Sequence, residues 1–213
     1  LAPTPARGDS VARILEEIRN QDAAGANYID LNAGTGSGDP AQEAADLNWL
    51  IDIALKTTEK KVSLDSSDPN VLRSAIEYLD RRRPALLNSV NGESDRLEPL
   101  MKLVARFDCP VIALAMDDSG IPPTPEKRLE VCGRIVAAAS KAGVSEASLF
   151  FDPLVLPMVS DTSQPQITFA TLRRIKSLFP EAKTTLGLSN VSHGLPQRRT
   201  VNQAFLLAAL ANG

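Results

Sequence analysis

The chain contains one histidine, His193, and two cysteines, Cys109 and Cys132, among its 213 residues. A thiolate-rich zinc site or an iron–sulfur cluster needs more soft ligands than these. Two cysteines also fall short of the disulfide framework of small secreted proteins, which favours a cytoplasmic protein. Cys109 opens an apolar stretch and Cys132 falls in an amphipathic one. We therefore expect both cysteines to be small core residues rather than nucleophiles.

The sequence also has no long hydrophobic run and no excess of positive charge. No apolar stretch approaches the ~20 residues of a membrane-spanning helix, so no membrane partner is expected. The formal net charge is -3, which argues against nucleic acid or an anionic membrane surface as the main partner. The hydrophobic share of 43% and the charged share of 23% are those of a globular protein with one substantial core.

Short apolar runs alternate regularly along the chain with longer stretches of helical periodicity. Runs rich in Val, Ile, Leu and Phe predict strands that are buried on both faces, as in a parallel sheet. The predicted strands are residues 28–32, 62–65, 85–88, 111–116, 149–152 and 185–190.

The stretches between these strands carry helix start signals. Asp39-Pro40, Asp68-Pro69 and Thr124-Pro125 each place a capping side chain before a proline at the first helical position. Stripes of Leu, Ile and Ala at helical spacing follow, which indicates helices with one face in the core. The predicted helices cover residues 11–19, 71–79, 129–139, 167–178 and 201–210, with a further helix that carries Leu47, Leu50, Ile51 and Leu55.

This order of elements predicts an α/β protein in which one helix is followed by about six strand–helix repeats. A (β/α)8 TIM barrel has eight such units in about 250 residues, so we expect one barrel domain over residues 1–213, with the first and last strands outside this chain. An open doubly wound sheet is the competing architecture. The glycine-rich stretch 34–38 lacks the lysine of a phosphate-binding loop and is interpreted as a flexible strand-to-helix loop.

Most of the predicted strands end in Asp, Asn or Ser, and the functional site of a β/α barrel lies at these ends. Such residues often only cap helices, which is our interpretation of Asp39 and Asp68. Asp65, Asn88 and Asp152 instead follow an apolar residue directly, so we expect their side chains to point into the barrel mouth. Buried carboxylates need partners, and few Lys or Arg residues lie near them in the sequence. We therefore expect a ligand rich in N–H donors, or a metal.

If the ligand is a metal, a second class of enzyme remains an alternative. Mg²⁺ prefers oxygen ligands and would accept Asp65, Asp117 and Asp152. The protein would then be a metal-dependent barrel lyase or aldolase that uses strand-end aspartates. Asp118 has no assigned role in either interpretation.

Residues 187–192 read Gly-Leu-Ser-Asn-Val-Ser and form a second notable feature. A glycine in a buried strand lets a ligand approach the backbone closely. Ser189, Asn190 and Ser192 then offer hydrogen-bonding groups that carry no formal charge. Arg198 and Arg199 follow at a helix start, where at least one is expected to be solvated and one could reach an anionic part of a ligand.

Seven stretches of the chain carry a family resemblance in order over nearly its whole length: 29–32, 64–66, 87–89, 116–122, 151–157, 187–192 and 202–206. Together they resemble the methyltetrahydrofolate:corrinoid methyltransferases, a pterin-binding TIM-barrel family that includes the folate module of cobalamin-dependent methionine synthase. Dihydropteroate synthases share the barrel, but their late Ser-Arg-Lys stretch is absent here. Leu188-Ser189-Asn190 occupies the comparable strand end.

The resemblance implies that Asp65, Asn88 and Asp152 hold the pterin ring. The ring carries an amino group and N–H groups that a carboxylate accepts, and a carbonyl to which an amide donates. The resemblance also places Asn190 at N5, the atom that carries the methyl group, and Arg198 near the aminobenzoyl-glutamate side. His193 falls on a ligand-contacting loop position, although the family pattern has no histidine there.

In the implied reaction, cobalt(I) of a partner corrinoid protein attacks the N5-methyl carbon in line. N5 must gain a proton or a strong hydrogen-bond donor as its bond breaks, and such assistance contributes about 10²–10⁴-fold. The amide of Asn190 donates a hydrogen bond but has no proton to release, so we expect it to stabilise the transition state while water supplies the proton. Asp30, Asn32 and Asp65 are expected to position that water, with Ser189 as further polar support.

The resemblance further implies methyltetrahydrofolate as methyl donor or product, a corrinoid carried by a partner protein, no metal bound by this chain, and a homodimer. With one histidine and two cysteines, a zinc site that activates homocysteine is not expected. A non-catalytic pterin-binding module within a larger enzyme remains an alternative.

Overall fold

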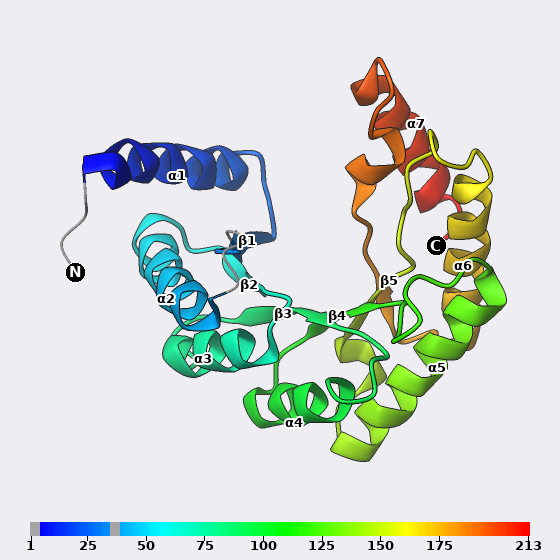
Figure 1. Cartoon of the computed structure of the whole chain (residues 1–213), viewed down its shortest axis with the longest axis horizontal. Coiled ribbons are helices and arrows are strands. Elements are labelled where there is room, and N and C mark those ends of the chain that lie inside the picture. The colour runs from blue at the N-terminus through cyan, green and yellow to red at the C-terminus, as the bar shows by residue number, and fades with distance from the viewer. Residues whose placement is uncertain (1–4, 35–38) are drawn as a thin grey trace. The chain divides into compact units, whose positions relative to one another are not determined.

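Figure 1 shows the computed structural model of the chain, which describes residues 5–34 and 39–213. Most of the predicted loop 34–38 therefore lies outside the described residues. The chain divides into two compact units, with the boundary between Asn88 and Ser89. None of the helices formed by the described residues has the length and apolar character that crossing a membrane requires.

The first unit contains three parallel strands and three helices. Strand β1 (Tyr28–Asn32) pairs with β2 (Lys61–Asp65), and β2 pairs with β3 (Ala85–Val90), so the strand order follows the chain. The helices are α1 (Pro5–Ala23), α2 (Pro40–Thr57) and α3 (Pro69–Leu79). Helices α2 and α3 lie side by side (Figure 1). Parallel neighbours joined through helices are the β/α repeats predicted from the sequence.

The predicted helix caps are confirmed. The Asp39 carboxylate accepts hydrogen bonds from two backbone N–H groups in the first turn of α2, and Asp68 accepts one from Asn70 in α3. Thr124 caps the helix that begins at Pro125 by accepting from the backbone N–H of Lys127. A capping side chain satisfies one of the N–H groups that the first turn leaves without a helical partner. These three aspartate and threonine side chains therefore start helices.

The second unit repeats the same pattern with shorter strands. Strand β4 (Val111–Leu114) pairs with β5 (Leu149–Asp152), and β5 pairs with β6 (Lys183–Thr184), again in parallel. The helices are α4 (Leu97–Phe107), α5 (Pro125–Ala142), α6 (Gln164–Leu178) and α7 (Arg198–Leu210), with 3-10 helices η1 (Glu146–Ser148) and η2 (Leu188–Ser192). Neighbouring helices from α4 to α7 pack in chain order.

The prediction of a strand over residues 185–190 is wrong. Strand β6 ends at Thr184, and residues 188–192 form the 3-10 helix η2. At Gly187 the backbone has φ -71° and ψ 67°, and the N–H of Leu188 donates to the carbonyl of Leu186 at 2.8 Å. This geometry is an inverse γ-turn, which is common at the end of a strand. The turn stops the extended segment before the polar residues of η2.

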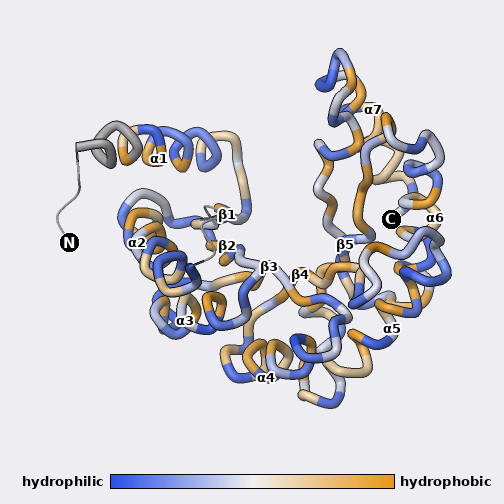
Figure 2. The backbone as a smooth tube through the Cα atoms, in the orientation of Figure 1, coloured by the Kyte–Doolittle hydropathy of each residue, from blue (hydrophilic) through white to orange (hydrophobic). Residues whose placement is uncertain are grey.

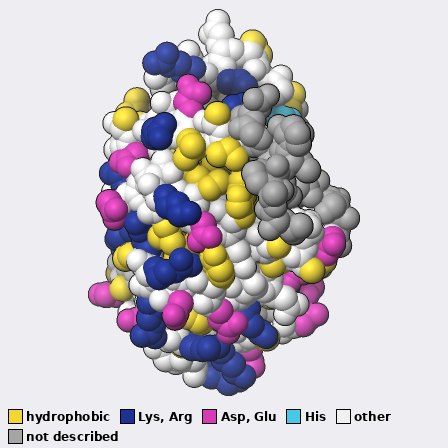
Figure 3. All heavy atoms as spheres, turned by 90° about the vertical axis from the view of Figure 1, so that its left-hand side faces the viewer, with side chains coloured by type: hydrophobic (Ala, Val, Ile, Leu, Met, Phe, Trp, Pro, Cys, Tyr) yellow, Lys and Arg dark blue, Asp and Glu magenta, His cyan; other side chains and the backbone are white. Residues whose placement is uncertain are grey.

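Apolar side chains fill the space between strands and helices in each unit. Leu47, Ile51 and Leu64 are fully buried in the first unit, as are Ile135 and Phe151 in the second. Figure 2 shows hydrophobic and hydrophilic residues alternating around the turns of α4, as an amphipathic helix requires. Figure 3 shows acidic and basic side chains interspersed on the face that it presents.

The two cysteines are free and buried, which confirms the interpretation of both as core residues. Burial disfavours the charged thiolate. It raises the pKa of the Cys109 thiol to about 11 and that of Cys132 to about 12. Neither thiol is therefore an activated nucleophile near neutral pH.

Candidate functional site

Polar side chains form a row across the ends of the three strands in the first unit. The register places Asn32 beside Asp65 and Asp65 beside Asn88. The amide Nδ2 of Asn32 donates to Oδ2 of Asp65 at 2.8 Å, and Nδ2 of Asn88 donates to Oδ1 of Asp30 at 3.3 Å. The carboxyl ends of parallel strands meet at one edge, so the sequence spacing alone brings these four side chains together.

The carboxyl group of Asp65 is partly buried in this row. Desolvation raises its pKa above the usual aspartate value, and the neighbouring Asp30 and Glu43 carboxylates raise it further. The hydrogen bond from Asn32 acts in the opposite direction. A carboxylate in such a place accepts hydrogen bonds from a neutral ligand strongly, because little water competes for its lone pairs.

In the second unit, Asp152 ends strand β5 with its side chain partly buried. The backbone N–H of Leu154 donates to Oδ1 at 2.8 Å, and the backbone N–H of Gly187 also donates to the carboxylate. Burial raises the pKa of Asp152 to about 6, against the lowering effects of these two N–H groups and of the Arg128 guanidinium. Asp152 is therefore a desolvated acceptor with capacity left for a ligand.

One cationic side chain from a distant part of the sequence does lie near the Asp152 carboxylate. Arg128 in helix α5 is fully buried and acts on this carboxylate through its charge. The sequence carried a signal for this residue. Arg128 shares the apolar stripe of α5 with Cys132 and Ile135, four and seven residues later. A charged residue within an apolar stripe indicates a buried polar function.

The 3-10 helix η2 carries Asn190, and its neighbours hold it in place. Val191 is fully buried against Val155, Leu172 and Phe205, while Asn190 itself is exposed. The backbone N–H of Asn190 donates to the carbonyl of Gly187 at 3.1 Å. The buried Val191 therefore anchors the backbone from which the Asn190 side chain projects.

Gly187 is a glycine because of space and not because of its backbone conformation. Its φ of -71° suits any residue, but a β-carbon there would lie 2.8 Å from Nδ2 of Asn190. The same residue donates its N–H to Asp152. Gly187 is exposed and lies in a γ-turn, so the interpretation of it as a glycine in a buried strand is wrong. The group that lies close to it is the Asn190 side chain, and the approach of a ligand stays a prediction.

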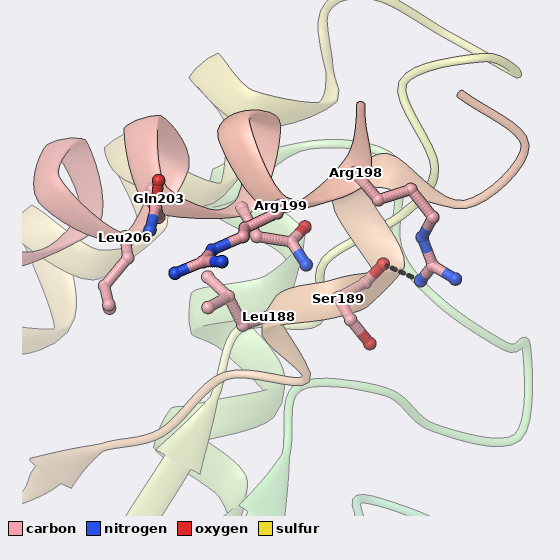
Figure 4. Close-up of a pocket in the computed structure, with 7 residues that line it drawn as sticks. Leu188, Ser189, Arg198, Arg199, Gln203 and Leu206 are labelled. Atoms are coloured by element: carbon pink, nitrogen blue, oxygen red, sulfur yellow. Dashed lines mark hydrogen bonds between the residues drawn. The ribbon is translucent and has the colours of Figure 1, made fainter. Parts of the chain in front are cut away.

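Arg198 begins helix α7 and reaches back to η2. Its Nε donates to Oγ of Ser192 at 3.1 Å, and its terminal nitrogen donates to the carbonyl of Ser189 at 3.0 Å (Figure 4). His193 is exposed at the end of η2 and donates its backbone N–H to the carbonyl of Asn190. Through these hydrogen bonds the side chain of Arg198 connects η2 to the start of α7.

A pocket of about 550 Å³ lies beside Arg198, and Figure 4 shows the residues that line it. The lining residues are Leu188, Ser189, Arg198, Arg199, Asn202, Gln203 and Leu206.

Asp117 and Asp118 have local roles in the second unit. Oδ1 of Asp117 accepts from the backbone N–H and hydroxyl of Ser119, and its Oδ2 pairs with Arg134. These contacts, led by the Ser119 hydroxyl, lower the pKa of Asp117. Asp118 accepts from the backbone N–H and hydroxyl of Ser94. Within the described ranges, no group of three His, Cys, Asp or Glu side chains gathers as metal ligands do.

A family model described as "Pterin binding enzyme" matches residues 5–213 of the chain. The chain belongs to the pterin-binding enzyme family. Several relatives match it over most of its length. It is 33% identical over 204 residues to the methylcorrinoid:tetrahydrofolate methyltransferase of Eubacterium limosum, covering 95% of the chain and 73% of that protein. It is 30% identical over 206 residues to the methionine synthase of Mycobacterium tuberculosis, covering 91% of the chain but only 17% of that longer protein.

Several solved structures of dihydropteroate synthases have a similar fold. The enzyme from Xanthomonas albilineans is 21% identical and matches with a TM-score of 0.77, covering 99% of the chain and 80% of that structure. The enzyme from Coxiella burnetii is 18% identical, with a TM-score of 0.67 over 96% of the chain and 77% of that structure. These likenesses confirm the predicted α/β class and its TIM-barrel type for this pterin-binding enzyme.

The predicted site residues of this pterin-binding enzyme fall into two groups, one in each unit. Asp30, Asn32, Asp65 and Asn88 form the hydrogen-bonded row of the first unit. The second unit holds Asp152, Ser189, Asn190, His193 and Arg198, and the carbonyl of Gly187 accepts from the backbone N–H of Asn190.

Proposed function

We propose that this protein is a methyltransferase that moves the N5-methyl group between methyltetrahydrofolate and the cobalt of a corrinoid protein. The observation that carries the proposal is the 33% identity over 95% of the chain to a methylcorrinoid:tetrahydrofolate methyltransferase. The site chemistry agrees with it, because the groups proposed to hold the pterin ring, Asp65, Asn88 and Asp152, are carboxylates and an amide suited to a neutral heterocycle.

The pterin ring would be recognised by Asp65, Asn88 and Asp152. The two carboxylates accept from the amino and N–H groups of the ring. One amide hydrogen of Asn88 is directed to Asp30, which leaves a second hydrogen for the ring carbonyl. Partial burial of Asp65 and Asp152 strengthens these hydrogen bonds. His193 and Arg198 are proposed as further contacts, with Arg198 toward the aminobenzoyl-glutamate side.

Asn190 is proposed as the catalytic residue. Its amide donates to N5 as the methyl–nitrogen bond breaks, which stabilises the negative charge that develops there. The proton that N5 finally takes comes from water, which Asp30, Asn32 and Asp65 orient, with support from Ser189. Gly187 leaves the room that the Asn190 amide needs.

We further propose that residues 1–213 act as one barrel domain in the cytoplasm, as a homodimer, with no metal bound by this chain. The direct partner would be a separate corrinoid protein. The match to 17% of a methionine synthase favours a second candidate, in which the same barrel serves as the folate-binding module of a longer protein. Methyl transfer by the chain alone to free cob(I)alamin separates an active enzyme from a module that only binds.

Two measurements test the proposed function. Titration calorimetry with methyltetrahydrofolate, with and without a chelator, should show binding that does not depend on a divalent metal. The absorbance change of cob(I)alamin on methylation should then show turnover. A lack of folate binding, or binding that requires the metal, would contradict the methyltransferase and favour the lyase alternative.

Replacing Asn190 with alanine should lower kcat by about 10²-fold, because a donor that acts mainly in the transition state is lost. The dissociation constant of methyltetrahydrofolate should change far less, since this contact strengthens as the bond breaks. Asn70→Ala removes an exposed amide on helix α3 and serves as the control. An equal loss in kcat and in affinity would refute the catalytic role of Asn190.

A further inference from the structure

Arg128 is a fully buried arginine whose guanidinium joins three segments of the second unit. Its Nε donates to the carbonyl of Pro122 at 2.9 Å. One terminal nitrogen donates to the carbonyls of Pro153 and Leu154 at 2.7 and 2.8 Å, and the other lies 3.5 Å from Oε1 of Gln164. Each nitrogen of the guanidinium therefore has an acceptor.

The two carbonyls held by one nitrogen belong to the residues directly after Asp152. Leu154 has φ 65°, a left-handed conformation that costs free energy for a side chain of this size. In this conformation its N–H donates to Oδ1 of Asp152 at 2.8 Å. Arg128 thus holds in place the turn that orients the carboxylate.

A packing role alone does not account for this residue. Burying a guanidinium is costly, and an apolar residue of similar volume in the stripe of α5 would avoid that cost. The four hydrogen-bond acceptors of Arg128 are neutral, and the carboxylate that acts on it is Asp152. Asp161, which accepts from Nε2 of Gln164 at 2.8 Å, is the next acidic group in this network.

We propose that Arg128 is a positioning residue for pterin binding, which fixes the direction of the Asp152 carboxylate by holding the carbonyls of Pro153 and Leu154. Its charge also faces that carboxylate and favours the ionised form that accepts N–H donors. Within the part of the chain that the structure describes, the groups that favour the ionised form of Asp152 are this guanidinium and the N–H groups of Leu154 and Gly187. This proposal rests on the proposed folate binding by Asp152.

The test uses two substitutions that separate charge from geometry. Arg128→Lys keeps a positive charge but has one nitrogen in place of three. Arg128→Met keeps an unbranched apolar side chain and removes the charge. Arg174→Gln removes an exposed arginine that pairs with Glu126 and is the control. Methyltetrahydrofolate affinity is measured from pH 5 to 8 by calorimetry, and melting temperatures and circular dichroism report the folded state.

Arg128→Lys should fold and bind methyltetrahydrofolate about ten- to a hundredfold more weakly, with the pH midpoint of binding near the wild-type value of about 6. A folded Arg128→Met should show the weaker binding and a midpoint moved to higher pH. Wild-type affinity in a folded Arg128→Lys variant, or failure of that variant to fold, would overturn the positioning role. If the wild-type protein itself does not bind methyltetrahydrofolate, the proposed function fails instead.

Discussion

Burial makes the Asp152 carboxylate a strong hydrogen-bond acceptor for the proposed ligand, and it also lowers the stability of the folded protein at neutral pH. Burial raises its pKa in the folded protein to about 6, above the ~3.9 of an unfolded chain. The folded state therefore holds this proton more tightly, and the stability that it contributes below pH ~4 is lost as the pH rises to about 6. At neutral pH the folded protein carries an ionised carboxylate that burial disfavours.

Replacing Asp152 with asparagine should separate these effects. Asparagine does not titrate, so the variant should be more stable than wild type at pH 7 by up to about 3 kcal/mol, and this gain should vanish toward pH 4. Its affinity for methyltetrahydrofolate should fall about ten- to a hundredfold, because a charged acceptor is lost. Urea denaturation at several pH values and calorimetry measure the two quantities.

Asp161→Asn is the matched control, with the opposite sign. The pKa of this exposed carboxyl is lowered, first by the backbone N–H of Ser163. Its stabilising contribution is present above pH ~4 and is lost as the pH falls, so the asparagine variant should lose stability at neutral pH. A less stable Asp152→Asn at pH 7 would show that burial does not govern the ionisation of Asp152.

The sequence predicted the positions of some site residues but not of others. Asp65 and Asp152 end their strands as predicted, because the sequence marks where an apolar strand stops, whereas β3 continues past Asn88 to Val90. Asn32 beside Asp65 then follows from register. Arg128 was missed because its role depends on carbonyls six, 25 and 26 residues away, and only the folded chain brings these together.

At the scale of elements, the long amphipathic helices and the buried strands were predictable, since caps and hydrophobic period act over a few residues. Helix α4 was not predicted, because its N-cap residue, Arg96, makes no side-chain cap hydrogen bond. Residues 185–190 were assigned to a strand on apolar content. A single γ-turn at Gly187 overrides that preference, and apolar content alone does not distinguish a short strand from a 3-10 helix.

A substitution at Gly187 tests whether the turn at this residue and η2 together position the Asn190 amide. Gly187→Ala should place a β-carbon 2.8 Å from Nδ2 of Asn190 and push that amide from its position. We expect kcat to fall about tenfold or more, since small displacements of a catalytic group are costly. Circular dichroism should show unchanged helix content, because φ at Gly187 suits alanine.

Gly133→Ala provides the control for this substitution. Gly133 lies inside helix α5, and an added β-carbon there meets no atom within 4 Å. Alanine should stabilise the protein by about 0.5–1 kcal/mol through its helix propensity and leave kcat unchanged. Wild-type turnover in Gly187→Ala would show that the space above Gly187 is not needed by Asn190.

At the scale of the whole molecule, the repeated strand–helix order was the most predictable property. Every repeat carries the same local pattern, so an error in one element leaves the class intact. The family match over residues 5–213 crosses the boundary between the two compact units. The proposal of a single domain follows from that match and leads to a thermodynamic expectation.

If residues 1–213 are one domain, both units should unfold in one transition. Trp49 in α2, the only tryptophan, reports on the first unit by fluorescence. The buried thiols of Cys109 and Cys132 report on the second unit by their reaction with a thiol reagent. In a urea titration the two probes should give the same midpoint, as two-state unfolding requires.

Methyltetrahydrofolate at about 100 times its dissociation constant should then stabilise both units together by about 2.7 kcal/mol. A common shift of the fluorescence and thiol midpoints is expected, because ligand contacts are proposed in each unit, at Asp65 and Asn88 in the first and at Asp152 and Asn190 in the second. The Asp152→Asn variant, measured at the same folate concentration, should show a smaller shift for both probes. A folate-dependent shift of the thiol midpoint without one at Trp49 would instead confine ligand binding to the second unit and refute the roles of Asp65 and Asn88.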